Sequence, residues 1–342
     1  MTATLAGPMR LSIDAWDPAY GASGEADTEP DGAAPPIHLD VETPEQHWRP
    51  IDPDPGIQRP EAVLFVDGVR RIDARAWVDT QPDAGGPARS AVQGLCASYA
   101  AGVICCRTKH AHLLTADVRR GLFTTTMHAT DLHTHAGTYR LNVTPPRSGI
   151  PHIQVLNLAV QRSLADVEID VAAAARATLP DHGVTTGDDL LVVDGSLRRG
   201  RQRLPRAIGL VKTHDRTYLP EHLNRLISTL TAGQRTPAFR MGSSWERHSW
   251  YLRLPCGPGA PWAGIVRIEC AANLDTADVI TLANLSQAAI PRYASAEHKD
   301  PRAPQNLHPI AGLERDLHHR IGNRQLLYRA LRRAARTNTT KP

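Results

Sequence analysis

An apolar run followed by an aspartate-glycine pair occurs twice along the chain. The first run covers residues 62–66 and precedes Asp67-Gly68, and the second covers 190–193 and precedes Asp194-Gly195. Uninterrupted apolar runs of four to five residues are typical of strands that are buried on both faces. We therefore predict buried strands at 62–67 and 190–194, each of which ends at an aspartate.

Between and after these strands the pattern alternates between strand and helix periodicity. Leu156, Val160, Leu164 and Val171 recur at helical spacing, which predicts a helix over 156–178. The other predicted strands cover 69–78, 98–106, 122–126 and 138–143 (the last two as a hairpin), 207–211, 236–241, 249–254 and 263–270. Further predicted helices follow Pro220, cover 277–289 and, as one basic C-terminal helix, cover 312–335. Strands, a helix and another buried strand favour a mixed α/β fold with a partly parallel sheet.

Composition changes sharply near residue 59. Residues 1–58 are rich in Pro, Asp, Glu, Gly and Ala, so we predict a largely irregular N-terminal extension with a short ordered arm around Ile37 and Trp48. The folded domain is expected over 59–336, and 337–342 is expected to be a tail.

The charge balance is mildly basic and the cysteines show no pairing pattern. The 342 residues include 39 Lys and Arg against 35 Asp and Glu, which gives a net charge of +4, and four of the bases are lysines. Arginine suits phosphate contacts, although a GC-rich coding bias also enriches it. The five cysteines form no CxxC pair, which argues against a structural zinc site and against a disulfide framework. Because no apolar run approaches the length of a membrane helix, we expect a cytoplasmic protein without a membrane partner.

The two strand-end aspartates are the strongest chemical signal. If the two strands are parallel neighbours, Asp67 and Asp194 lie at the same end of the sheet, where α/β sites form. Two carboxylates about 4 Å apart repel by about 4 kcal/mol at an effective dielectric of about 20, and a divalent cation reverses that sign. Oxygen ligands prefer Mg²⁺ or Mn²⁺ to zinc. The alternative is that each Asp-Gly pair only forms a turn.

A third acid is expected from the helix over 156–178, which carries Asp166, Glu168 and Asp170. Glu168 shares a helix face with Leu164 and Val171, so it points closer to the core than Asp170 does. We therefore favour Glu168, while a solvated helix face remains the alternative for all three acids.

These motifs and their order resemble the NurA nuclease family. The similarity covers residues 59–330 and is carried by Asp67-Gly68, the acidic helix, Leu-Val-Val-Asp194-Gly-Ser-Leu, Ile208-Gly-Leu-Val-Lys212 and Thr217-Tyr218-Leu219. The resemblance implies an RNase H-like mixed sheet with flanking helices and a helical C-terminal region. It also implies Mn²⁺-dependent (or Mg²⁺-dependent) cleavage of DNA from 5′ ends in DNA repair, by a homodimer that works with a HerA-type hexameric DNA translocase. Asp67, Glu168 and Asp194 would be the catalytic metal ligands, and Lys212 would lie near the phosphate path.

Two departures from the family pattern favour an alternative function. Val69 stands where family members usually have serine, and the late family histidine is displaced, which leaves His308 as a possible fourth ligand. A catalytically decayed DNA-binding adaptor on the same fold is therefore the second hypothesis. In either case the arginines near the two aspartates would contact phosphates without reading sequence; they are Arg70, Arg198, Arg199 and Arg201.

A histidine-rich stretch supports a third hypothesis. Asp131-Leu132-His133-Thr134-His135 resembles the first metal motif of PHP-type phosphoesterases, because an HxH pair on a strand places both imidazoles on one face. The preceding residues are polar and no later partner motif follows. The third hypothesis is therefore a histidine-metal phosphoesterase centred on His133 and His135. The stronger interpretation of this stretch is an exposed hairpin that carries histidines without a metal.

Overall fold

The computed structural model describes residues 36–80, 90–108, 110–197, 200–214, 217–242, 245–257 and 260–339. The chain divides into two compact units. The β2 unit comprises Pro60–Ile208 and Pro309–Pro342, and the β10 unit comprises Met1–Arg59 and Gly209–His308. The predicted domain at 59–336 thus draws on both units, and its boundaries stay a prediction.

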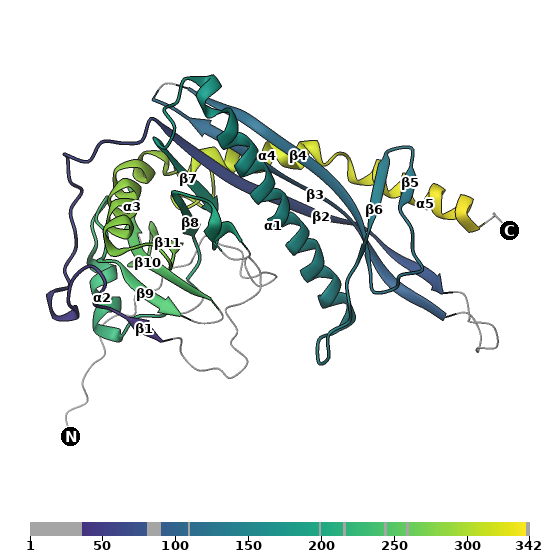
Figure 1. Cartoon of the computed structure of the whole chain (residues 1–342), viewed down its shortest axis with the longest axis horizontal. Coiled ribbons are helices and arrows are strands. Elements are labelled where there is room, and N and C mark those ends of the chain that lie inside the picture. The colour runs from purple at the N-terminus through teal and green to yellow at the C-terminus, as the bar shows by residue number, and fades with distance from the viewer. Residues whose placement is uncertain are drawn as a thin grey trace. The chain divides into compact units, whose positions relative to one another are not determined.

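The β2 unit is built around a mixed sheet (Figure 1). Its strands are β2 (Ala62–Thr80), β3 (Ser90–Cys106), β4 (Ala111–Thr124), β5 (Leu132–Thr134), β6 (Gly137–Val143), β7 (Asp189–Asp194) and the start of β8 (Ala207–Val211). The strand order is β7-β2-β3-β4-β6-β5, with β3 antiparallel to both β2 and β4, and β7 parallel to β2. An antiparallel meander, a crossover helix and a parallel return strand beside the first confirm the expected α/β fold with a mixed sheet and flanking helices.

Helices cover both faces of this sheet. The β2 unit contains α1 (His152–Thr178), η2 (Leu179–His182), η3 (Arg201–Arg203), α4 (His308–Arg320, of which His308 belongs to the other unit) and α5 (Arg324–Thr339). A Cβ added at Gly68 would meet Leu164 of α1, whereas one added at Gly102 would meet Leu313 of α4. Since Gly68 pairs with Ala101, and Ala101 and Gly102 point to opposite faces, α1 and α4 pack on opposite sides of the sheet. None of the helices that the structure describes is long and apolar enough to cross a membrane.

The predicted break between strands at 62–67 and 69–78 is wrong. β2 runs without interruption for 19 residues, and Asp67 and Gly68 pair in register with Gly102 and Ala101 of β3. The long partner strand keeps the glycine in the ladder, so Asp67-Gly68 forms no turn. The predicted strand at 98–106 likewise begins earlier, at Ser90, because it pairs with β2 from Val63 to Thr80.

Two further expectations from the pattern need correction. The segments at 122–126 and 138–143 do not form a hairpin, because β4 and β6 pair in parallel and β6 forms its hairpin with β5. The single C-terminal helix over 312–335 is two helices, α4 and α5. Gly322 adopts a φ of 86° at the break, a conformation that glycine adopts without steric cost.

The β10 unit contains a second, antiparallel set of strands. Its elements are β1 (Ile37–His38), η1 (Glu45–His47), the end of β8, α2 (Glu221–Thr229), β9 (Phe239–Gly242), β10 (Glu246–Arg253), β11 (Ile265–Ala271), α3 (Thr276–Ala289) and η4 (Ile290–Tyr293). The strand order is β1-β9-β10-β11-β8. Tyr251 of β10 packs in an apolar cluster with α2, while its neighbour Trp250 donates a hydrogen bond to Ser286 of α3 at 3.1 Å. The two helices therefore cover opposite faces of β10.

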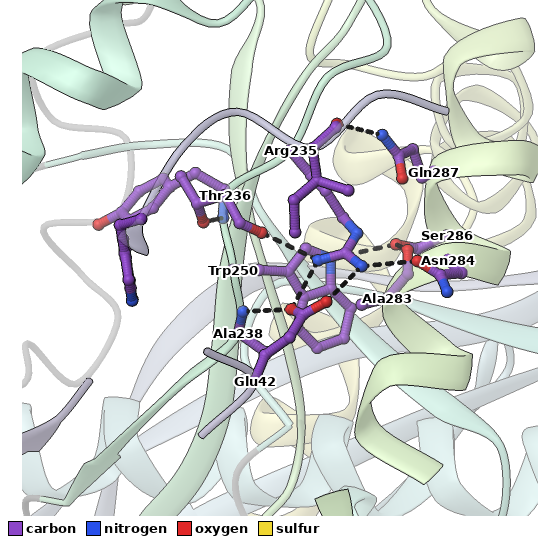
Figure 2. Close-up of polar contacts among 12 residues, drawn as sticks. Glu42, Arg235, Thr236, Ala238, Trp250, Ala283, Asn284, Ser286 and Gln287 are labelled. Carbon is purple, nitrogen blue, oxygen red and sulfur yellow. Dashed lines mark hydrogen bonds and ion pairs between the residues drawn. The ribbon is translucent and has the colours of Figure 1, made fainter. Parts of the chain in front are cut away.

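A buried ion pair fixes the N-terminal segment to this unit (Figure 2). Both terminal nitrogens of Arg235 donate to the carboxylate of Glu42 at 2.8 Å, and one of them also donates to Asn284 Oδ1 of α3 at 2.6 Å. The same carboxylate accepts from the backbone amide of Ala238 at 2.7 Å. Nearby, Ile37, Leu39 and Trp48 pack against the apolar cluster under α2, so the short ordered arm predicted in this region is present.

Candidate functional site

The parallel pairing of β2 and β7 places Asp67 and Asp194 at neighbouring positions on two adjacent strands. The pairing runs from Ala62 opposite Asp189 to Val66 opposite Val193, and Asp67 and Asp194 are the next residues on the two strands. Asp194 is the last residue of β7, whereas Asp67 lies within β2, and both are partly buried. The β-strand register thus gives neighbouring strand positions to two acids that are far apart in the chain.

Glu168 reaches β2 from the α1 side. Its side chain is buried, and a Cβ added at Gly68 would lie 2.7 Å from Glu168 Oε1. Glycine after Asp67 therefore permits the close approach of this carboxylate. By strand alternation Asp67 shares a face with Val69, which packs against α4, so Asp67 and Glu168 come from opposite faces of β2.

The other two acids of α1 lie at the surface. Asp170 is exposed and pairs with Arg119 of β4 at 2.8 Å. Asp166 is also exposed. The burial of Glu168 is the reason why, among the three acids, it remains the candidate for the site.

Arg201 of η3 neutralises Glu168. The two side chains form an ion pair in which the exposed fractions are only 15% and 7%, and Arg201 Nη1 also donates to the carbonyl of Ser196 at 3.0 Å. Burial lowers the pKa of the Arg201 guanidinium to about 10, although the negative charges of Asp67 and Asp166 oppose the shift. The buried Nε of Arg201 donates no hydrogen bond. Arg201 therefore contributes a positive charge beside Glu168, in addition to the phosphate contact predicted from the sequence.

The remaining arginines predicted near the aspartates are only partly described. Arg70 lies on β2 opposite Tyr99 and is partly buried, and its burial lowers its pKa. Arg198 and Arg199 lie outside the residues that the structure describes. A phosphate-binding role for these three arginines stays a prediction.

Lys212 and His308 belong to the β10 unit. Lys212 is buried and its Nζ donates to Asn306 Oδ1 at 2.9 Å, and Asn306 in turn donates to Asp300 Oδ2 at 2.7 Å. His308 is exposed and begins α4. The roles of Lys212 near the phosphate path and of His308 as a fourth ligand stay predictions.

The described residues do not form a preformed metal site. Within them, no three His, Cys, Asp or Glu residues form a group that could hold an ion. The oxygen donors of Asp67, Asp194 and Glu168 suit Mg²⁺ or Mn²⁺ chemically, yet Glu168 is paired with Arg201 and approaches β2 from the other face than Asp67. The three carboxylates are therefore the right type of ligand for the implied metal, but their positions do not allow them to bind one ion together.

The histidine motif also lacks a metal-binding arrangement among the described residues. His133 lies on the short strand β5, is exposed, and contacts Thr138 Oγ1 at 3.0 Å in the β5–β6 hairpin. Asp131 accepts hydrogen bonds from Arg140 and from the Leu141 amide, so the acid of the motif stabilises the hairpin. These contacts match the exposed hairpin that was the alternative to a phosphoesterase site.

Two features of the site were not found from the sequence. Nothing in the pattern links Glu168 with Arg201, which was singled out only as one of several clustered bases. The close approach of Glu168 to Gly68 was not predicted either. A glycine that follows an acid inside an apolar strand is the one available signal, because it often marks the close approach of another group.

Comparisons with known proteins find similar chain arrangements at low sequence identity. The NurA nuclease from Sulfolobus solfataricus is 11% identical with a TM-score of 0.39, over 80% of this chain and 82% of that chain. The catalytic domain of human endonuclease V is 14% identical with a TM-score of 0.36, over 80% and 90% of the two chains. Human ENDOV is 13% identical with a TM-score of 0.34, over 78% and 87%. A scan against protein-family models gives no match, and neither does a search of curated proteins. At these values the similarities assign no function.

Proposed function

We propose that this protein is a nuclease that hydrolyses phosphodiester bonds in DNA. The observation that carries the proposal is that Asp67 and Asp194 occupy neighbouring positions on the parallel strands β2 and β7. The buried Glu168 beside Gly68 supplies a third carboxylate within the same unit. Asp194 is the last residue of β7, and the carboxyl ends of strands are the usual location of sites in α/β sheets.

The finer proposal follows the resemblance of the sequence motifs to the NurA family. It comprises Mn²⁺-dependent or Mg²⁺-dependent cleavage from 5′ ends during DNA repair, as a cytoplasmic homodimer that acts with a HerA-type hexameric translocase. The order of the motifs supports this proposal, and the sheet order of the β2 unit is compatible with it. Each of these properties is a separate proposal and needs its own measurement.

The charges of the site explain why a cation belongs to the proposal. A phosphodiester is anionic, so carboxylates repel it unless positive charge lies between them. When bound, a divalent cation would supply that charge and polarise the phosphate. The chain's own residues then have two tasks: Asp67 and Asp194 provide oxygen donors from a rigid sheet, and Gly68 leaves room for Glu168.

The test is Mn²⁺-dependent degradation of 5′-labelled linear DNA by the purified protein. Asp194→Asn removes one charge from the pair with little change in volume, and we expect the rate to fall by at least about a hundredfold. Asp170→Asn is the matched control, because it removes an exposed acid that pairs with Arg119. Full activity in Asp194→Asn, or an equal loss in both variants, would contradict the proposal.

A DNA-binding adaptor without catalytic activity is the second candidate. The observation that favours it is the ion pair that neutralises Glu168, together with the absence of a three-acid group among the described residues. An adaptor would bind DNA in gel-shift experiments and would show no cleavage at any Mn²⁺ concentration. Cleavage that disappears in Asp194→Asn would exclude it.

A further inference from the structure

The C-terminal helix α5 is a strongly basic element. Its 16 residues contain five arginines and no acidic residue. These five charges exceed the net charge of +4 of the whole chain, so the remaining residues together carry no net positive charge. An asymmetry of this kind indicates a polyanionic partner for the basic segment.

The orientation of α5 is fixed by its buried face and by its first turn. Leu327, Ala330 and Leu331 are buried, and Leu331 packs in an apolar cluster with Tyr139 of β6. Asn323 Oδ1 accepts hydrogen bonds from two backbone amides of the first turn at 2.9 and 3.1 Å, which caps the helix. The helix therefore presents its opposite face to solvent in a defined orientation.

The outward face of α5 carries a row of arginines. Arg329, Arg332 and Arg336 follow one another at spacings of three and four residues, so they lie on one side of the helix, and all three are exposed. The Arg332 guanidinium lies over the Tyr328 ring, 6.0 Å from its centroid. At a rise of about 1.5 Å per residue, the row from Arg329 to Arg336 is about 10 Å long.

The charges of this row are not balanced within the helix. Like charges three or four residues apart on a helix repel, and α5 has no acid to offset them. Within the described part of the chain, Arg324, Arg329 and Arg332 form no ion pair, whereas Arg320 at the end of α4 pairs with Asp316. A bound anion would neutralise this repulsion.

We infer that α5 binds the phosphate backbone of duplex DNA, outside the acidic site. One strand of B-DNA carries a phosphate about every 3.4 Å along its axis, so a row of about 10 Å spans about three phosphates. Such contacts position DNA without reading its sequence. The inference rests on the proposed function, because DNA is the substrate of the proposed nuclease.

The arrangement of apolar side chains favours DNA over an anionic membrane. A helix that binds a membrane surface inserts one continuous apolar face. On α5 the exposed apolar side chains are Leu326 and Tyr328, and their helical positions lie on opposite sides of the arginine row. The outward face is therefore suited to phosphate contacts and not to insertion.

The experiment is fluorescence anisotropy of the full chain with a short labelled DNA duplex, in EDTA so that binding is measured without cleavage. The test variant combines Arg329→Gln, Arg332→Gln and Arg336→Gln. We expect it to bind at least about tenfold more weakly than wild type at moderate salt, because phosphate contacts dominate affinity. The slope of log affinity against log salt should become shallower by about three, one for each arginine.

The matched control removes three exposed arginines from other elements. It combines Arg75→Gln, Arg147→Gln and Arg225→Gln, which changes the net charge by the same amount. This control should keep the wild-type salt slope. Equal affinity and slope in the two triple variants overturn the inference, and so does a wild-type protein that binds phosphatidylserine vesicles and no DNA.

A second measurement on the wild-type protein guards against a variant that does not fold. Phenylglyoxal modifies accessible arginines, and peptide mass spectrometry locates the modified side chains. The duplex should protect Arg329 and Arg332 and leave Arg75 reactive. An equal reaction of Arg329 and Arg332 with and without saturating duplex also overturns the inference.

The outcomes separate this inference from the proposed nuclease. If DNA cleavage depends on Asp194 while the α5 variant binds the duplex as the control does, the nuclease stands and the inference fails. If the α5 variant alone loses binding and its salt slope while wild type cleaves no DNA, the inference stands and the nuclease fails.

Discussion

Asp67 and Asp194 follow directly after the last paired residues of two parallel strands, so the sheet places them at neighbouring positions. Asp67 is held on its other side by β3, where it pairs with Gly102. The position of Asp67 therefore depends on a continuous backbone ladder and not on a loop. An active site on rigid strands needs little reorganisation before it binds its ligands.

Gly68 is predicted to be indispensable for the packing of Glu168. In Gly68→Ala the new Cβ would lie 2.7 Å from both Glu168 Oε1 and Leu164 Cδ1, so these two buried side chains have to move. We expect a loss of about 1–3 kcal/mol in the free energy of unfolding, the usual range for overpacking. Chemical denaturation measures the change. Gly312→Ala is the control, because nothing lies within 4 Å of its added Cβ, and it should not destabilise the protein. Equal stability of the two variants would contradict the close approach of Glu168.

The Glu42–Arg235 pair is predicted to hold the N-terminal segment in the β10 unit. Only 1% of the Arg235 side chain and 11% of the Glu42 side chain are exposed. Glu42→Gln leaves the buried guanidinium without its counter-charge, so we expect a loss of about 3–5 kcal/mol in the free energy of unfolding. Glu221→Gln is the control, because it breaks an exposed pair with Arg225 that is worth less than about 0.5 kcal/mol. Thermal and denaturant unfolding should rank the two variants in this order, and a Glu42→Gln protein as stable as wild type would show that the pair is dispensable.

Alkaline pH is predicted to weaken the β2 unit through Cys96. Burial, together with the charge of Asp73, raises the pKa of the Cys96 thiol to about 12. In the unfolded chain a thiol loses its proton near pH 8.5, so the stabilisation from the neutral thiol is complete below that pH. It is lost as the pH rises from about 8.5 towards 12, with a slope of about 1.4 kcal/mol per pH unit.

The Cys96→Ala variant tests this prediction. Its free energy of unfolding should fall less steeply than that of wild type between pH 9 and 11, by about one proton per molecule. Cys256→Ala removes an exposed cysteine and should keep the wild-type slope. Equal slopes in Cys96→Ala and wild type would show that this thiol does not contribute.

The parts of the fold that depend on local pattern were predictable from the sequence. The apolar runs before Asp67 and Asp194 form β2 and β7, and the helical spacing from Leu156 to Val171 forms α1. Their parallel pairing was expected from a strand, a helix and a second buried strand, and it is confirmed. Local pattern was sufficient here because each element buries a continuous apolar surface.

The errors arose where distant residues decide the local structure. Asp67-Gly68 was predicted to end a strand, but pairing with β3, more than thirty residues away, keeps it extended. The ion pair between Glu168 and Arg201 joins α1 to a turn that follows β7 in the chain, and no periodicity encodes such a contact. Sequence reasoning therefore named Glu168 and Arg201 separately and did not predict that they form an ion pair.

The most direct test of the central claim is the rate at which purified protein releases label from 5′-labelled linear DNA in Mn²⁺, compared between wild type and Asp67→Asn. Asp67 lies inside a paired strand, so the substitution changes a charge and leaves the backbone ladder in place. The account predicts cleavage by wild type and a rate at least about a hundredfold lower in Asp67→Asn. An Asp67→Asn protein that cleaves DNA at the wild-type rate, or a folded wild-type protein that binds Mn²⁺ and cleaves no DNA, would contradict it.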